Sequence, residues 1–325
     1  MGEFDLIARY FTRPVRRAVL GVGDDCALLA PTPGMQLAVS SDMLVEGRHF
    51  FAGTDARRLG HKALAVNLSD LAACGARPLA FTLALALPAV DAAWLQGFSA
   101  GLLALADAHG CELIGGDTTQ GPLNICITVF GEVPADQALL RSGARAGDDL
   151  YVSGTLGDAR LALEALQGRH TTLAPGVLAT ARQRLEAPTP RVALGQALRG
   201  VASSALDVSD GLLGDLGHIL RASGVGACIH TTETIKLIAA SAHPESAGGH
   251  FDTELLHQCT LAGGDDYELA FTAPVAQRAA VAAAAQASAT PVTRIGCIEA
   301  APGLRLIDAH GQPMPQRYAS FDHFA

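Results

Sequence analysis

The chain has 325 residues, of which 49% are hydrophobic and 17% charged. This composition can fill a sizeable core and excludes disorder as the main state. At roughly 150 residues per domain, the length suggests two domains or one large one. Acidic residues outnumber basic ones by 32 to 23, and the only lysines are Lys62 and Lys236. A broad basic surface for nucleic acid is therefore not expected.

Nothing in the sequence indicates a membrane or secreted protein. The most apolar stretch, residues 79–90, is too short to cross a bilayer, and residues 1–11 lack the pattern of a signal peptide. The seven cysteines are scattered without a C-x-x-C pair, which is typical of a reducing compartment and does not match a structural zinc site. We expect a cytoplasmic protein without membrane or nucleic-acid partners.

The first part of the chain alternates helices with strands. Apolar residues recur at helical spacing in residues 3–11, 59–73 and 92–109, and Gly110 closes the third helix. Strands are expected at 36–41, 79–87, 111–117 and 123–133, where apolar or β-branched runs are bounded by turn residues.

A polar, turn-rich stretch at 134–147 indicates a domain boundary near residue 137, giving domains 1–137 and 138–325. In the second domain, strands are expected from residue 148 and near 226–231 and 267–272. Helices are expected near 158–167, 176–186, 190–199 and 211–223 and in the alanine-rich 275–289. This mixture predicts an α/β or α+β fold.

The most informative feature is a set of aspartates in segments rich in small residues, most of them directly after glycine or serine, each expected at or just past the end of an apolar segment. A single such aspartate is most simply a helix cap or a turn residue, but the combination recurs along a chain with few charges. Converging carboxylates repel one another unless divalent cations lie between them, and Mg²⁺ shares few protein carboxylates with substrate phosphates. The aspartates are Asp24, Asp25, Asp42, Asp70, Asp117, Asp207, Asp210, Asp215, Asp265 and Asp266.

Several familiar nucleotide sites are absent from the sequence. No G-x-x-x-x-G-K-[ST] segment and no protein-kinase motif is present, and Gly21-Val-Gly23 lacks the third glycine of a dinucleotide fingerprint. A nucleotide site here would depend on metal ions together with arginine.

Nine motifs, in order along nearly the whole chain, carry a resemblance to a known family. They are GEFDLIARYF (2–11), GVGDDCALL (21–29), SSDMLVEGRHF (40–50), KALAVNLSDLAACGARP (62–78), LIGGDTT (113–119), RSGARAGDDLYVSG (141–154), LDVSDGLLGDLGHI (206–219), GGDDYEL (263–269) and FDHF (321–324). Together they resemble the thiamine-monophosphate kinases, which share a superfamily with aminoimidazole ribonucleotide synthetase and selenophosphate synthetase.

The resemblance implies Mg²⁺-dependent, in-line transfer of the terminal phosphoryl group of ATP to thiamine monophosphate, giving thiamine diphosphate and ADP. It also implies a homodimer and a two-domain fold. The N-terminal domain would carry a mixed sheet covered by helices, bind metal and ATP, and form the dimer interface. The C-terminal α/β domain would complete the nucleotide and substrate site.

The resemblance also assigns residues, motif by motif. Asp42 and Asp210 are the acids on which turnover is expected to depend most. Gly116, Asp117, Arg141 and Ser209 look like nucleotide contacts, and His49, Asp265 and Phe321 look like substrate contacts, with Asp265 standing where the family usually has Glu. The implied ligands of several Mg²⁺ ions, direct or through water, are Asp25, Ser40, Ser41, Asp42, Asp70, Asp117, Asp207, Asp210 and, as a further position, Asp215.

Two alternatives stay open at this point. The chain could be another ATP-dependent synthetase of the superfamily. A selenophosphate synthetase would need a reactive Cys or selenocysteine near its N-terminus, and Cys26 directly follows the acidic pair, but the segment GVGDDCALL matches the kinases better. It could also be a non-catalytic protein that binds metal or nucleotide. The complete set of acids argues against the second alternative.

Overall fold

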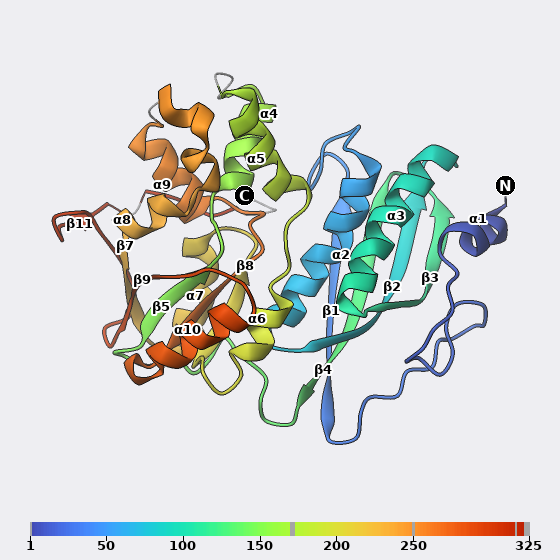
Figure 1. The fold of residues 1–325 in the computed structure, drawn as a ribbon, viewed down its shortest axis with the longest axis horizontal. Coiled ribbons are helices and arrows are strands. Elements are labelled where there is room, and N and C mark those ends of the chain that lie inside the picture. The colour runs from blue at the N-terminus through green and yellow to red at the C-terminus, as the bar shows by residue number, and fades with distance from the viewer. Residues whose placement is uncertain (1, 170–172, 249–250, 316, 322–325) are drawn as a thin grey trace. The chain divides into compact units, whose positions relative to one another are not determined.

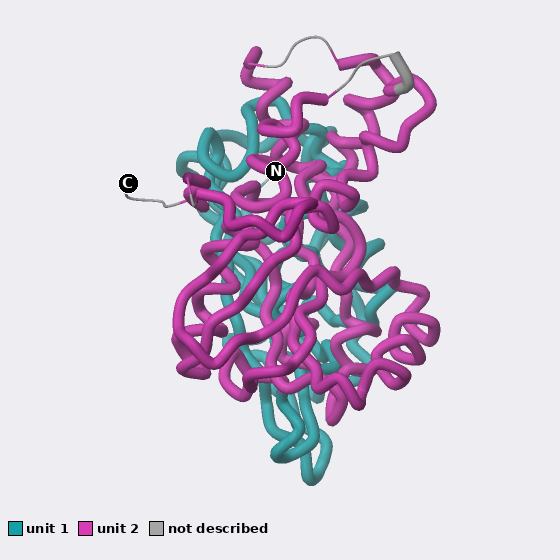
Figure 2. The backbone as a smooth tube through the Cα atoms, turned by 90° about the vertical axis from the view of Figure 1, so that its left-hand side faces the viewer, with its two compact units in different colours: residues 1–71, 76–138 teal, residues 72–75, 139–325 magenta. Residues whose placement is uncertain are grey.

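The computed structural model describes residues 2–169, 173–248, 251–315 and 317–321 (Figure 1). The chain divides into two compact units, coloured separately in Figure 2: unit 1 comprises residues 1–71 and 76–138, and unit 2 comprises residues 72–75 and 139–325. Each unit is built on its own β-sheet. The α/β fold expected from the sequence is confirmed.

Unit 1 has a four-stranded mixed sheet in the order β1-β4-β2-β3. Its strands are β1 (Met35–Val45), β2 (Arg77–Leu87), β3 (Glu112–Gln120) and β4 (Asn124–Pro134). Strand β4 is antiparallel to both β1 and β2, whereas β2 and β3 are parallel. A parallel pair needs a long crossover, and α3 supplies it. The helices are α1 (Glu3–Tyr10), α2 (Ala56–Ala73) and α3 (Ala92–His109).

Helix α3 begins and ends where its sequence signals predict. The Asp91 side chain accepts hydrogen bonds from the backbone N–H groups of Ala93 and Trp94, and Gly110 ends the helix in the left-handed conformation with φ 58°. Figure 1 shows α2 and α3 over one face of the sheet.

The two faces of this sheet differ because side chains alternate along a strand. Leu83 and Ile127 belong to the face that is buried. On β1 the alternate residues Leu37, Val39 and Met43 are about half exposed, at 46%, 56% and 53%. At β1, the second face is therefore largely apolar and about half exposed in the single chain.

Unit 2 has a seven-stranded sheet in the order β11-β10-β7-β9-β5-β8-β6. Its strands are β5 (Asp149–Ser153), β6 (Ser204–Val208), β7 (Gly226–His230), β8 (Glu268–Ala273), β9 (Val292–Glu299), β10 (Gly303–Ile307) and β11 (Pro313–Met314). Its α-helices are α4 (Asp158–Leu166), α5 (Pro175–Glu186), α6 (Val192–Ala197), α7 (Leu212–Ser223), α8 (Thr231–Thr234), α9 (Thr253–Ala262) and α10 (Arg278–Ala287). Short 3₁₀ turns are η1 (Ile235–Leu237), η2 (Ala239–Ala242), η3 (Pro244–Gly248) and η4 (Val275–Gln277).

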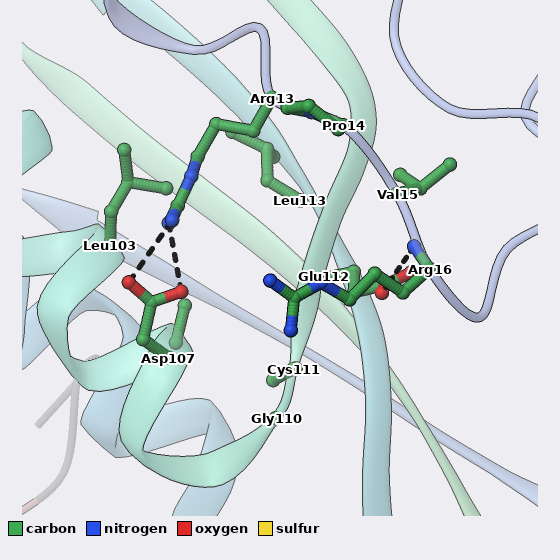
Figure 3. A pocket seen from close by; sticks show the side chains of 11 residues that line it. Arg13, Pro14, Val15, Arg16, Leu103, Asp107, Gly110, Cys111, Glu112 and Leu113 are labelled. Atoms are coloured by element: carbon green, nitrogen blue, oxygen red, sulfur yellow. Dashed lines mark hydrogen bonds and ion pairs between the residues drawn. The ribbon is translucent and has the colours of Figure 1, made fainter.

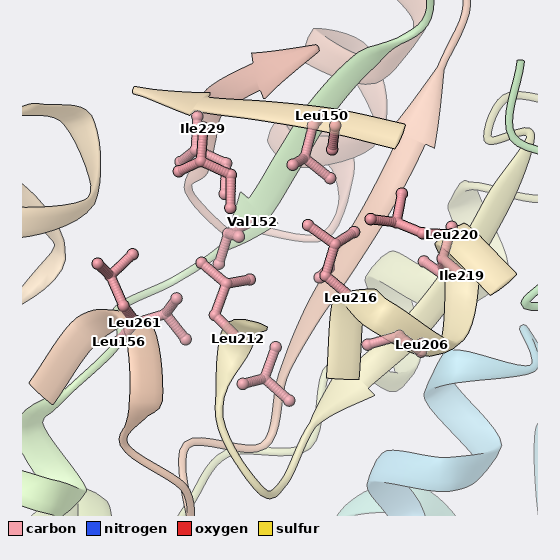
Figure 4. Close-up of a cluster of buried hydrophobic side chains, with 14 of the residues drawn as sticks. Leu150, Val152, Leu156, Leu206, Leu212, Leu216, Ile219, Leu220, Ile229 and Leu261 are labelled. Carbon is pink, nitrogen blue, oxygen red and sulfur yellow. The ribbon is translucent and has the colours of Figure 1, made fainter. Parts of the chain in front are cut away.

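The main core of unit 2 lies between α7 and the sheet. Leu212, Leu216 and Ile219 of α7 pack in one cluster with Val152 of β5 and Ile229 of β7 (Figure 4). These five side chains are fully buried. The cluster fixes α7 on the sheet and, with it, the loop between β6 and α7.

Two details of unit 1 differ from the expectation that the aspartates follow the ends of apolar segments. Strand β1 extends to Val45, because all its residues pair with β4, so Asp42 lies inside a strand. Asp117 lies inside β3 for the same kind of reason, as it pairs with Ala84 of β2. Within the described residues, no helix is long and apolar enough to span a membrane.

Candidate active site

One group of expected site residues lies where β1 packs under α2. Ser40 Oγ donates a hydrogen bond to Asp70 Oδ2 at 2.5 Å. Two residues along the strand, the backbone N–H of Asp42 donates to Asn67 Oδ1 at 3.1 Å. The Asn67 amide is held in turn by the Ala63 carbonyl at 3.0 Å. Ser40, Asp42 and Asp70 therefore form one oxygen-rich group on the helix-covered side of the sheet.

Ser41 points the other way, because neighbouring residues of a strand face opposite sides. Its hydroxyl lies 3.0 Å from Thr128 Oγ1 and donates to the Ile127 carbonyl at 3.2 Å, both on β4. The expected metal ligands Ser40 and Ser41 thus carry their hydroxyl groups on different faces of unit 1.

Gly116 and Asp117 lie on β3, the opposite edge of the sheet from β1. Because Phe81 pairs with Leu113 and Thr82 with Gly115, Ile114 is an extra residue, and this irregularity sets which way the following residues point. Gly116 has φ 147°, and a Cβ there would lie 1.8 Å from the Leu83 carbonyl oxygen, so only glycine fits.

Asp117 is far from the Ser40–Asp42–Asp70 group for two reasons. It lies on the opposite edge strand of the sheet, and its side chain is on the opposite face. Residues that pair across neighbouring strands have their side chains on the same face. The pairs Asp117–Ala84, Ala84–Cys126 and Cys126–Met43 therefore place Asp117 on the same face as Met43, the one that the helices do not cover. Three strand spacings of about 4.8 Å place β3 about 14 Å from β1. Unit 1 does not bring Asp117 to Asp42.

Asp25 and His49 lie in loops of unit 1. Asp25 is exposed, in a loop whose Ala27 packs against the buried cluster of Ala18, Leu79, Ala80 and Ile114. His49 Nδ1 accepts a hydrogen bond from the Val45 backbone N–H at 3.0 Å, so in the neutral ring the proton is on Nε2. The His49 carbonyl accepts from Nζ of the buried Lys62 at 3.3 Å.

In unit 2, Asp207 lies near the end of β6, and the loop that follows it before α7 carries Ser209 and Asp210. Asp215 Oδ2, in the first turn of α7, accepts hydrogen bonds from the backbone N–H groups of Ser209, Asp210 and Gly211 at 3.0, 3.0 and 3.1 Å. Burial raises the pKa of Asp215 to about 6, the charge of Asp210 adds to this, and the three hydrogen bonds oppose it.

A second segment, residues 263–267, lies directly against this loop. The backbone N–H of Asp265 donates to the Ser209 carbonyl, and that of Tyr267 to the Val208 carbonyl, both at 2.8 Å. A Cβ on Gly264 would lie 2.5 Å from the Ser209 carbonyl oxygen. Asp265 and Tyr267 both have positive φ, 66° and 51°, which is uncommon for residues other than glycine and marks a strained backbone.

Two buried carboxylates hold this strained segment in place. Both oxygens of Asp266 accept from the Gly157 backbone N–H at 3.0 Å, and burial raises the pKa of Asp266 well above its usual value. Glu268 is fully buried and accepts from Arg184 at 2.7 Å, Arg191 at 2.6 Å and Ser153 at 2.6 Å. The anchors explain why the chain tolerates a left-handed tyrosine here.

The end of the described chain forms the third side of this site. The Phe321 backbone N–H donates to the Asp210 carbonyl at 3.0 Å. Ser320 Oγ accepts from the Gly214 N–H at 2.9 Å and donates to the Gly211 carbonyl at 3.3 Å. Phe321 is 46% exposed.

Arg141 lies near α7, and the structure adds a neighbour that the sequence did not indicate. Burial lowers the pKa of His218, the charges of Arg141 and Arg221 lower it further, and Asp210 opposes them. His218 thus stands in the field of two expected site residues. Its only sequence signal was its place one helical turn after Asp215.

Unit 2 therefore gathers Asp207, Ser209, Asp210, Asp215, Asp265 and Phe321 around one loop. In unit 1 the expected residues are divided between two faces and two edges of the sheet. Within the part of the chain that the structure describes, no three His, Cys, Asp or Glu side chains are grouped closely enough to hold a metal ion. The assignment of these residues to metal, nucleotide and substrate stays a prediction.

A cavity of about 410 Å³ in unit 1 involves none of these residues. It lies beside the ion pair of Arg13 with Asp107 and the Glu112 carboxylate, which accepts from the backbone N–H of Arg16 (Figure 3). These contacts tie the segment before residue 18 to α3 and β3.

Comparisons with known proteins give the family. Residues 23–133 match the family described as "AIR synthase related protein, N-terminal domain". The thiamine-monophosphate kinase of Salmonella typhimurium strain LT2 is 46% identical over 100% of this chain and 98% of its own length. The crystal structure of thiamine-monophosphate kinase from Stenotrophomonas maltophilia K279a is 44% identical, covers 96% of both chains and has a TM-score of 0.82. A structure described as "AaThiL complexed with AMPPCP and TMP" is 28% identical over 91% of this chain and 89% of its own, with a TM-score of 0.76. The chain belongs to the thiamine-monophosphate kinase family.

Proposed function

We propose that this protein transfers the terminal phosphoryl group of ATP to thiamine monophosphate, forming thiamine diphosphate and ADP. The observation that carries the proposal is the full-length match, at 46% identity, to a thiamine-monophosphate kinase. A relative that resembles this chain over nine-tenths of its length is described with AMPPCP, an ATP analogue, and TMP. The two alternatives, another synthetase of the superfamily and a non-catalytic binder, have no comparable support.

The donor set fits Mg²⁺, which prefers hard oxygen ligands. Asp207 lies near the end of β6 and Asp210 lies two residues beyond that end. Within the described part of the chain, no ion pair joins Asp210 to an arginine or lysine. The negative charge of Asp210 instead contributes to raising the pKa of Asp215, as expected for carboxylates close together without a cation. When bound, Mg²⁺ would neutralise phosphate charge. Ligands for it are proposed from Asp25, Ser40, Ser41, Asp42, Asp70, Asp117, Asp207 and Asp210.

The chain's own residues would orient the two substrates. Arg141 offers a fixed positive charge for a nucleotide phosphate, with Gly116 and Ser209 as further nucleotide contacts. His49 would donate from Nε2 to the phosphate of thiamine monophosphate, since its Nδ1 is already an acceptor. Asp265 and Phe321 would contact the rest of the substrate, because both have their backbone bonded to the loop of Asp210. Phosphoryl transfer needs this positioning and charge neutralisation more than covalent help.

We also propose a homodimer in which the partner subunit supplies part of the site. Within one chain, Asp117 lies about 14 Å across the sheet from Asp42 and faces the other side. The same side exposes Leu37, Val39 and Met43, an apolar surface that a second copy would cover. A second sheet packed there would bring its own residues to this face.

A cytoplasmic location is proposed as well. Among the described residues, which include all seven cysteines, no disulfide forms, and Cys111, Cys228 and Cys259 are buried, as expected for a reducing compartment.

The direct test is product formation by the purified protein. With ATP and Mg²⁺, ADP release should require thiamine monophosphate, and thiamine diphosphate should form in equal amount. Asp42→Asn and Asp210→Asn should each abolish turnover while leaving the circular dichroism spectrum unchanged. ADP release without thiamine monophosphate, or none with it, would overturn the proposed reaction, and near-normal kcat in either variant would overturn that residue's assignment.

A further inference from the structure

One oxygen atom organises the loop at the centre of the unit 2 site. Asp215 Oδ2 lies 3.0–3.1 Å from three consecutive backbone N–H groups, those of residues 209–211, and its side chain is 6% exposed. Consecutive N–H groups that converge on one point form a nest for an anion. Here a carboxylate of the same chain occupies the nest.

We propose that Asp215 is a positioning residue, which shapes the 209–211 loop so that Asp207, Ser209 and Asp210 face the substrates, rather than a ligand of Mg²⁺. The proposal rests on the proposed function and revises the expectation from the family resemblance. Three N–H donors already use the acceptor capacity of Oδ2, and the core cluster of Leu212 and Leu216 fixes the helix that carries it.

The position of the 209–211 loop also fixes the two segments that carry Asp265 and Phe321. The Ser209 carbonyl accepts from Asp265, and the Asp210 carbonyl accepts from Phe321, so both substrate-side residues are bonded to the backbone that Asp215 holds. If the loop shifts, nucleotide-side and substrate-side groups move together. A misplacement of about 1 Å costs about 100-fold in rate.

The substitutions Asp215→Asn and Asp215→Ala separate the two roles. The oxygen of asparagine can still accept from the three N–H groups, but it lacks the charge of a strong Mg²⁺ ligand; alanine lacks both. In metal-free, nucleotide-free protein, amide hydrogen exchange at residues 209–211 should stay slow in D215N and rise about tenfold or more in D215A. In turnover, the kcat of D215N should fall by less than about tenfold, and its Mg²⁺ requirement should be unchanged. The kcat of D215A should fall by about 100-fold, and excess Mg²⁺ should not restore it.

Asp308→Ala is the matched control, because Asp308 Oδ1 accepts two backbone N–H groups, from His310 and Gln312, in a turn away from the site. It should raise exchange in its own turn only and leave kcat unchanged.

Slow exchange at 209–211 in D215A would overturn the proposal. The proposal would also be overturned if D215N lost as much activity as D215A. A D215N enzyme that needed far more Mg²⁺ while its loop amides stayed protected from exchange would overturn it too. If D215A does not fold, D215N decides alone. The exchange measurement needs no turnover, so it fails or succeeds independently of the proposed reaction.

Discussion

Buried carboxylates in unit 2 accept hydrogen bonds from specific donor groups, and their removal should change the stability of the protein by different amounts. Glu268 has no exposed surface and holds Arg184 and Arg191, whose side chains are only 14% and 15% exposed. Removing one member of a buried ion group leaves uncompensated charge, which costs more than the group itself contributes.

Glu268→Gln should lower the free energy of unfolding by about 3–5 kcal/mol, because two nearly buried guanidinium groups lose their counter-charge. Urea denaturation followed by circular dichroism measures it. The control is Glu254→Gln, which breaks the exposed pair with Arg317 and should cost no more than about 1 kcal/mol. Equal losses in the two variants would show that burial of Glu268 does not matter.

Asp149 predicts a pH dependence of stability. Hydrogen bonds from Arg278, and further ones from Arg294 and Tyr151, hold its pKa at about 2 against the opposing effect of burial. A carboxylate with a lowered folded pKa adds stability above its unfolded pKa of about 3.9, and this stability is lost as the pH falls toward 2.

The difference in unfolding free energy between wild type and Asp149→Asn should therefore be largest above pH 4 and should disappear toward pH 2. It should reach at most about 2 kcal/mol, because Arg278 and Arg294 are both about half exposed. Urea titrations across pH 2–6 measure it. A difference that stays constant through this range would contradict the assignment of the pKa.

At the scale of elements, local signals predicted the helices better than the strand limits. Helix 92–109 coincides with α3, because Asp91 and Gly110 are local start and stop signals. The full length of β1, the extra residue at Ile114 and strands β6, β9 and β10 depend on pairing with distant segments, which no single stretch of sequence encodes. For the same reason, the sequence singled out the aspartates as candidate site residues but could not predict which face of the sheet each occupies.

Glycines allow α2 and α3 to pack at close range. A Cβ on Gly101 would lie 1.8 Å from the Arg57 carbonyl oxygen, and one on Gly60 would lie 2.0 Å from that of Phe98. Because both obstacles are backbone, neither helix can relieve the clash by turning a side chain.

Gly101→Ala should therefore destabilise the protein by about 1–3 kcal/mol or more, despite the better helix propensity of alanine. Thermal or urea unfolding measures it. In the control Gly217→Ala, the nearest atom is 3.2 Å away at the mobile end of Arg221, so stability should hold or rise by up to about 1 kcal/mol. A stable G101A protein would mean that the helices lie farther apart.

For the whole molecule, the question is whether one chain makes a complete site. Ser40, Asp42 and Asp70 lie together in unit 1, whereas Asp117 lies on the other edge and the other face of the same sheet. If all four serve one ATP, the simplest assembly takes Asp117 from a second copy across the uncovered apolar face.

Mixed dimers test this arrangement. In a dimer of an Asp42→Asn chain with an Asp117→Asn chain, shared sites place both defects in one site and leave the other intact. Co-expression of the two inactive variants should then restore about one quarter of wild-type activity by random pairing. Co-expression of an Asp42→Asn chain with an Asp70→Asn chain should give no activity. Both residues of each site come from the same chain, so every site in a mixed dimer keeps one defect. Absence of recovery in the first pairing, with mixed dimers demonstrated by differently tagged chains, would mean that each protomer builds its site alone and that Asp117 serves a different role.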